Sequence, residues 1–183
     1  MRVRGQTNRS FVWIGFLVFS FLPAPVAAQS TAELDEHLRF LEPLIGPVWE
    51  GGFVGEEAAD LVISLRFEPV LSGRAVKYTR VAAELGYVSE THFYWSPARE
   101  EVRFLALNTR GIVGGGAVSV QDGAIVLHGV DQWPEGSVES KTVWQLDEEG
   151  VLKDTFTRVE GGTWVQGHVQ EFIARGIRAT GGQ

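Results

Sequence analysis

Three polar side chains on neighbouring predicted strands could bind the polar end of a ligand: Arg80, Glu90 and His92. Because successive side chains of a strand point to opposite faces, Val76 and Tyr78 share a phase with Arg80. If this apolar pair faces the interior, Arg80 faces it too. A buried charge must be paired, so Glu90 on the next strand is the natural partner of Arg80, with His92 beside it. This interpretation predicts an interior cluster that orients a polar ligand group.

The strand that carries Glu90 and His92 also allows the opposite orientation. Phe93 and Trp95 occupy its other face, and large aromatic side chains are usually found inside a protein. In that alternative the two aromatic rings fill the core, and Glu90 and His92 face solvent. Both orientations stay open on the sequence alone.

The last predicted strand poses the same choice. Trp164 and Phe172 share a phase with His168, so an inward Trp164 would bring the imidazole into the interior. In the alternative, Val165 and Val169 point inward and His168 lies on a wet surface. We therefore take Arg80, Glu90, His92, His168 and Trp164 as candidate ligand-binding residues.

The sequence lacks the short motifs that mark common catalytic and metal sites. It has no Cys, no Gly-x-Ser-x-Gly and no His-Glu-x-x-His. Its four histidines, His37, His92, His128 and His168, occur singly, and a lone strand histidine is mostly structural. We expect no metal site and nominate no catalytic residue. Enzymatic activity stays open, with a non-catalytic function preferred.

The elements that must position these side chains are one helix and about ten strands. Ser30 and Glu33 match a capping box, and Leu34, Leu38 and Leu41 follow at helical spacing. Downstream, short alternating segments are separated by turn residues, which is typical of an antiparallel up-and-down meander. The predicted strands are Val48–Val54, Leu61–Phe67, Arg74–Ala82, Tyr87–Trp95, Glu101–Asn108, Val113–Val120, Ala124–Val130, Val138–Leu146, Val151–Arg158 and Thr163–Ile173. We predict an all-β barrel capped by the N-terminal helix, because closure removes the exposed sheet edges.

The first 28 residues are typical of an export signal. Three arginines precede the apolar run from Phe11 to Leu22, and small residues end at Ala28. We expect residues 1–28 to be the signal peptide, residues 29–175 the barrel domain and residues 176–183 a frayed tail. Removing the three arginines from the 16 Lys+Arg leaves 13 against 23 Asp+Glu, a net charge of −10. Such an acidic chain lacks the basic footprint of a nucleic-acid-binding protein.

The segment LEPLIGPVWEGGF, Leu41–Phe53, resembles the opening of the lipocalin, fatty-acid-binding and nitrobindin-like barrels of the calycin superfamily. Tyr94–Pro97 is similar to a turn, and Trp164–His168 to a terminal stretch, of uncharacterised exported bacterial lipocalin-like proteins. The resemblance covers nearly the whole chain after the signal and implies that Trp49 is a structural cap at the barrel base.

The resemblance also bears on function. Together with the export signal, it suggests a periplasmic or secreted protein, and the short apolar run of that signal predicts that the protein is not an integral membrane protein after cleavage. The expected partner is a small, largely apolar molecule held in the barrel. No cofactor is expected, but nitrobindin-like barrels bind haem through a histidine, so the resemblance makes His168 or His92 a candidate haem ligand. The alternatives are a haem-binding nitrobindin-like protein, a barrel enzyme, and a packed structural or interaction domain of the cell envelope.

Overall fold

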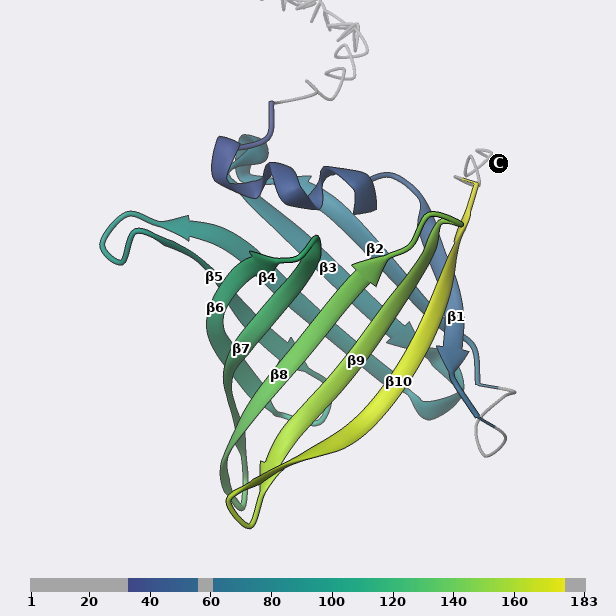
Figure 1. Cartoon of the computed structure of the whole chain (residues 1–183), viewed down its shortest axis with the longest axis vertical. Helices are drawn as coiled ribbons and strands as arrows, with labels where there is room; N and C mark the ends of the chain where they lie inside the picture. Colours follow the sequence, from purple (N-terminus) through teal and green to yellow (C-terminus); the bar gives the residue numbers. More distant parts are fainter. Residues whose placement is uncertain (1–32, 56–60, 177–183) are drawn as a thin grey trace, which may run out of the picture. The chain divides into compact units, whose positions relative to one another are not determined.

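The computed structural model describes residues 33–55 and 61–176. They form ten antiparallel strands in a closed barrel, in which each strand pairs with its neighbours in sequence and β1 pairs with β10 (Figure 1). The strands are β1 (Val48–Phe53), β2 (Ile63–Val70), β3 (Ala75–Ala82), β4 (Tyr87–Ser96), β5 (Glu101–Asn108), β6 (Val113–Gln121), β7 (Ala124–Trp133), β8 (Gly136–Leu146), β9 (Val151–Glu160) and β10 (Thr163–Arg175). The predicted all-β up-and-down barrel is confirmed, whereas the predicted signal peptide lies outside the described residues.

Short turns make this meander possible. At the β6–β7 turn, Asp122 and Gly123 both have positive φ angles, 51° and 80°, as the tightest hairpin turn requires. Two short 3₁₀ segments complete the connections: η3 (Leu71–Gly73) between β2 and β3, and η4 (Ala83–Leu85) between β3 and β4. The connections from β2 to β3, from β3 to β4 and from β6 to β7 are therefore compact.

The predicted helix is present, but it is a 3₁₀ helix and its predicted start is wrong. The helix η1 spans Glu36–Leu44, and the side chain of Asp35 accepts a hydrogen bond from the His37 backbone N–H at its start. Glu33 precedes the helix, so it has no place in a capping box. Asp35, which lies closer to the apolar stripe, caps the helix instead.

The helix closes one end of the barrel (Figure 1). Its apolar stripe, Leu38, Leu41 and Leu44, belongs to the same buried cluster as the barrel core. Trp49, on β1, is 3% exposed and donates its indole N–H to the Leu44 carbonyl at 2.9 Å. His37 stacks on Trp95 of β4 with ring centroids 3.7 Å apart. The helix is thus joined to the barrel by side chains as well as by the chain itself.

Aromatic rings fill the barrel interior beneath this helix. Phe67, Tyr78, Phe93 and Trp144 come from four different strands, and the Trp144 ring lies 5.0 to 5.7 Å from the other three rings. All four are at least 96% buried, because their relative exposures are 4% or less. This layer separates the helix-capped end from the more open end of the barrel.

Candidate functional site

A cavity of about 360 Å³ lies in the barrel on the far side of the aromatic layer from η1. Tyr78 and Trp144 line it from that layer, and Phe53, Phe104 and Phe156 line its walls. The volume falls in the range of small-molecule sites, which are mostly apolar with few polar groups. The barrel is therefore not packed solid.

Arg80 is one of five charged residues that line this cavity, with Arg110, Asp131, Asp154 and Arg158. Its partners lie on β9 and β10. Its guanidinium Nη1 lies 3.6 Å from Asp154 Oδ2, and Nη2 donates a hydrogen bond to Gln170 Oε1. The side chain of Arg80 is 16% exposed, whereas that of Asp154 is 2% exposed. The ion pair is thus buried on the Asp154 side and open to the cavity on the Arg80 side.

Burial dominates the ionisation of the groups around this pair. It raises the pKa of the Asp154 carboxyl above its ordinary value, although the Arg80 charge acts in the opposite direction. Burial also raises the pKa of the Tyr78 hydroxyl, which stays protonated at neutral pH. With both members ionised, the Arg80–Asp154 pair carries no net charge.

Several buried polar atoms near the pair have no hydrogen-bond partner among the described residues. They are Tyr78 Oη, Trp144 Nε1, Asp154 Oδ1 and Gln170 Nε2. Unpaired buried polar atoms are costly and uncommon in native proteins, so each requires an explanation. Trp144 lies close enough to Asp154, and Arg80 to Tyr78, for a hydrogen bond that lowers the pKa of the acceptor group. Small movements of these side chains, or a bound polar group, would therefore pair the atoms.

His168 also lines the cavity, but its imidazole is enclosed by aromatic rings. It stacks on Phe156 with centroids 5.1 Å apart and meets Phe53 edge-on at 5.7 Å. Burial, together with the nearby Arg80 charge, lowers the pKa of His168 to about 4, so the ring is neutral at pH 7.

His168 is the haem-ligand candidate that lines the cavity. Its Nε2 atom is buried and unpartnered, and the rings of Phe53 and Phe156 occupy the space beside it. We therefore derive no chemistry through haem.

Glu90 and His92 lie on the outer side of β4. Ser89 and Thr91 line the cavity, and the neighbouring residues on an alternating strand must point the other way. The His92 Nε2 and Glu90 Oε2 atoms lie 3.9 Å apart, and both side chains are more than a third exposed. The anticipated Arg80–Glu90 pair is therefore absent, because the solvent-facing alternative holds for this strand.

Trp164 also lies outside the cavity, because a β-bulge reverses the phase of β10. The register of β10 against β9 shifts between Gln166 and His168, which leaves Gly167 as the extra residue. His168 and Gln170 consequently face inward, whereas Trp164 is 44% exposed. The prediction that Trp164 and His168 share one face is wrong for this reason.

Asp154 and Gln170 were not among the candidate residues, although the sequence carried a signal for Asp154. Leu152 and Phe156 are apolar and share a phase with it, so the rule applied to β3 would have turned Asp154 inward. Gln170 shares the phase of Phe172, which is fully buried. Neither long-range contact with Arg80 could be read from spacing.

No group of three or more His, Cys, Asp or Glu side chains suited to holding a metal ion occurs within residues 33–55 and 61–176. In the same ranges no helix has the length and apolar character needed to cross a membrane. The chain matches no protein-family model, and no curated protein is detectably similar to it.

Proposed function

We propose that the protein binds a small, largely apolar molecule in the central cavity, with the polar end of that molecule at Arg80. The observation that carries this proposal is an ion pair in an aromatic-lined cavity of about 360 Å³. Asp154 is buried in this pair, whereas Arg80 is partly exposed to the cavity. The apolar walls favour a hydrophobic ligand body, and the convergent polar groups favour one fixed orientation.

The charge of the cluster indicates what kind of polar group the ligand carries. When Asp154 is ionised it neutralises Arg80, so an added carboxylate would meet no uncompensated positive charge there. An uncharged hydroxyl or amide can instead accept from Arg80 or Tyr78 and donate to Asp154, and a carbonyl can accept from Arg80 or Tyr78. We therefore infer a ligand whose buried end is polar but uncharged.

Fluorescent probe binding tests this proposal directly. The neutral probe N-phenyl-1-naphthylamine is titrated into the purified protein, and the anionic probe 1-anilinonaphthalene-8-sulfonate is titrated in parallel. We expect saturable binding of both, with tighter binding of the neutral probe. Tighter binding of the anionic probe would contradict an uncharged polar end.

A matched pair of substitutions ties the probe to the cavity. Ala106 lines the cavity, whereas Ala117, on the neighbouring strand β6, lies outside it. Ala106→Trp should weaken probe binding by about tenfold or more, because the indole fills the cavity. Ala117→Trp should bind as the wild type does. No saturable binding to the wild type, or equal binding by both variants, would overturn the proposed function.

We also propose that the chain is exported and that its barrel is of the lipocalin-like, calycin type. The basic start, apolar run and small residues before Gln29 support export. Fractionation of the producing cell, followed by mass spectrometry of the mature N-terminus, tests it. A protein that keeps Met1 inside the cytoplasm would contradict export.

A further inference from the structure

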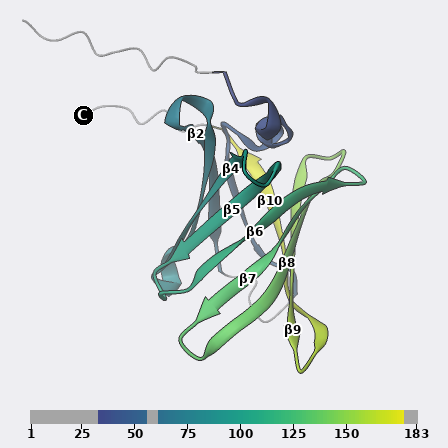
Figure 2. The same ribbon diagram turned by 90° about the vertical axis from the view of Figure 1, so that its left-hand side faces the viewer.

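The wall of the barrel is open between β8 and β9 near the end opposite η1. The β8–β9 ladder stops at the Ser140–Arg158 pair. Beyond it, Gly136 to Glu139 pair only with β7, and Val159 and Glu160 pair only with β10. Figure 2 shows the β7–β8 and β9–β10 hairpins diverging at this end. We call this gap the β8–β9 split.

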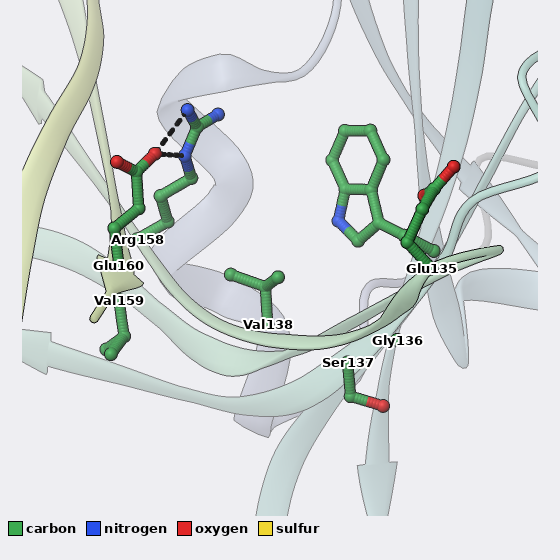
Figure 3. A pocket seen from close by; sticks show the side chains of 8 residues that line it. Glu135, Gly136, Ser137, Val138, Arg158, Val159 and Glu160 are labelled. Carbon is green, nitrogen blue, oxygen red and sulfur yellow. Dashed lines mark hydrogen bonds and ion pairs between the residues drawn. The ribbon is translucent and has the colours of Figure 1, made fainter. Parts of the chain in front are cut away.

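The split encloses a pocket of its own, of about 340 Å³. Figure 3 shows Val138 and Glu135 on the β8 side and the Arg158–Glu160 ion pair on the β9 side. The Arg158 Nη2 and Glu160 Oε1 atoms are 2.5 Å apart, so the pair satisfies the Arg158 charge beside the gap.

The pocket in the split adjoins the central cavity. Trp133 and Arg158 line both. A molecule that passes between the two hairpins and then past the side chains of Trp133 and Arg158 would thus reach the cavity without crossing the aromatic layer or η1. No strand–strand ladder has to be broken on this path, because the pairing already ends at Ser140.

Side chains of three strands meet on the outer face of the barrel, where the β8–β9 ladder ends. Trp164 lies on β10 opposite Val159, the first residue of β9 beyond the end of the β8–β9 pairing. From there its ring reaches Lys141 of β8, whose Nζ lies 5.4 Å from the ring centroid, and His128 of β7, at 5.9 Å between centroids. Glu139, in the split itself, holds His128 through a 2.7 Å contact to Nε2. We call Trp164, Lys141 and His128 the outer latch.

The outer latch is weak enough to open. Cation–π contacts at exposed sites contribute little, and Trp164 is 44% exposed while the His128 and Glu139 side chains are about half exposed. The contacts are nevertheless specific, since a single indole bridges two strands that share no backbone pairing with β10. Such a contact suits a gate that opens and closes by thermal motion.

We propose that the β8–β9 split is the route by which the ligand enters and leaves the central cavity, and that Trp164 latches this route from outside. The inference rests on the proposed function, because it requires that a ligand be bound. It also gives Trp164 a role at the site from a position outside the cavity.

A reversible lock across the split tests the route. Glu139 and Val159 are the residues that would pair next if the ladder continued, so Glu139→Cys/Val159→Cys can bridge the gap. The chain has no other Cys, so this disulfide is the only one that can form within it. Val143→Cys/Thr155→Cys, at an outer-facing pair inside the intact ladder, is the matched control.

Stopped-flow binding of N-phenyl-1-naphthylamine is measured in the oxidised and reduced forms. Locking the split should slow both association and dissociation by about tenfold or more while the equilibrium affinity changes little. Reduction should restore both rates, and the control pair should show no redox effect. Unchanged rates in the locked protein would overturn the proposal and assign the route to the open mouth beside Tyr87 and Arg110, which also line the cavity.

Removing the latch gives a second test that does not depend on disulfide formation. Trp164→Ala should raise both rates together by several-fold, whereas Tyr94→Ala, an exposed aromatic on the outer face of β4, should leave them unchanged. If Trp164→Ala leaves both rates unchanged, Trp164 does not restrict passage through the β8–β9 split, and its proposed role is wrong. If the wild type shows no equilibrium binding, the proposed function fails instead, so the two failures are distinguishable.

Discussion

Removal of the Arg80 charge should expose the cost of the buried Asp154 carboxylate. Asp154 is 1% exposed, and Arg80 is the only positive charge that forms an ion pair with it among the described residues. At 3.6 Å, and with an effective dielectric constant of about 20, the attraction between the two charges is roughly 5 kcal/mol. Much of this offsets the desolvation of the two ions, so the pair itself adds little net stability.

Arg80→Met removes the attraction but leaves the desolvation cost of Asp154. We expect the free energy of unfolding at pH 7 to fall by about 3 to 5 kcal/mol, measured by urea denaturation and tryptophan fluorescence. Arg80→Met/Asp154→Leu should recover most of this loss, because an apolar pair of similar volume needs no counter-charge. The double variant serves as the control for lost packing around the arginine stem.

The pH dependence distinguishes an electrostatic cause from a packing cause. Burial already raises the pKa of Asp154, and loss of Arg80 raises it further. A carboxyl with a raised folded-state pKa stabilises the fold below its unfolded pKa, and this stability is lost as pH rises through the folded pKa. The difference in the free energy of unfolding between Arg80→Met and wild type should therefore become smaller as pH falls from 7 towards 4. A difference that stays constant with pH would refute the reasoning, as would a double variant no more stable than Arg80→Met.

Three further perturbations test other parts of the structure. His168 should titrate by NMR with a pKa of about 4 instead of 6.5. The free energy of unfolding of the wild type should therefore fall by up to about 3 kcal/mol between pH 6.5 and pH 4, because only the unfolded state binds the proton in this range. His168→Gln should not show this fall. A normal titration would show that the ring is not enclosed. Trp49→Phe leaves the Leu44 carbonyl without its donor and should cost about 1 to 3 kcal/mol in urea denaturation; an unchanged stability would mean that the contact contributes nothing. Gly167→Ala places a methyl group 2.5 Å from the Phe156 ring and should cost about 1 to 3 kcal/mol, whereas Gly176→Ala, with open space around it, should be neutral. Equal stabilities of the two alanine variants would argue against a tightly packed bulge.

The sequence predicted the fold more fully than the site, because the fold depends on local patterns. Alternation on β2 placed Ile63, Leu65 and Phe67 inward, and all three are buried. The same rule turned Arg80 into the interior with Tyr78, and both line the cavity. The positions of the turn residues predicted the number of strands. These signals act within a few residues, so a single sequence contains them.

The partners of Arg80 depend on contacts that no local pattern contains. Gln170 lies 90 positions from Arg80 in the chain, and barrel closure brings the two together. The bulge at Gly167 was equally invisible, since a glycine within a strand can also occur without a register shift. One extra residue was enough to turn Trp164 outward while His168 stayed inward. The sequence also left the orientation of β4 undecided, because both of its faces carry large side chains.

The seam between β1 and β10 has a consequence for the order of folding. Every other strand pair joins neighbours in sequence and can form as a local hairpin, whereas this pair joins Val48 to Arg175, the two limits of the barrel. Closing so long a loop costs conformational entropy before the contact forms, so the seam should be the slow step. During synthesis from the N-terminus, β1 must wait with an unpaired edge until the last strand has been made. Throughout that interval the nascent chain is open to pairing with other chains, which makes the seam the point where aggregation competes with folding.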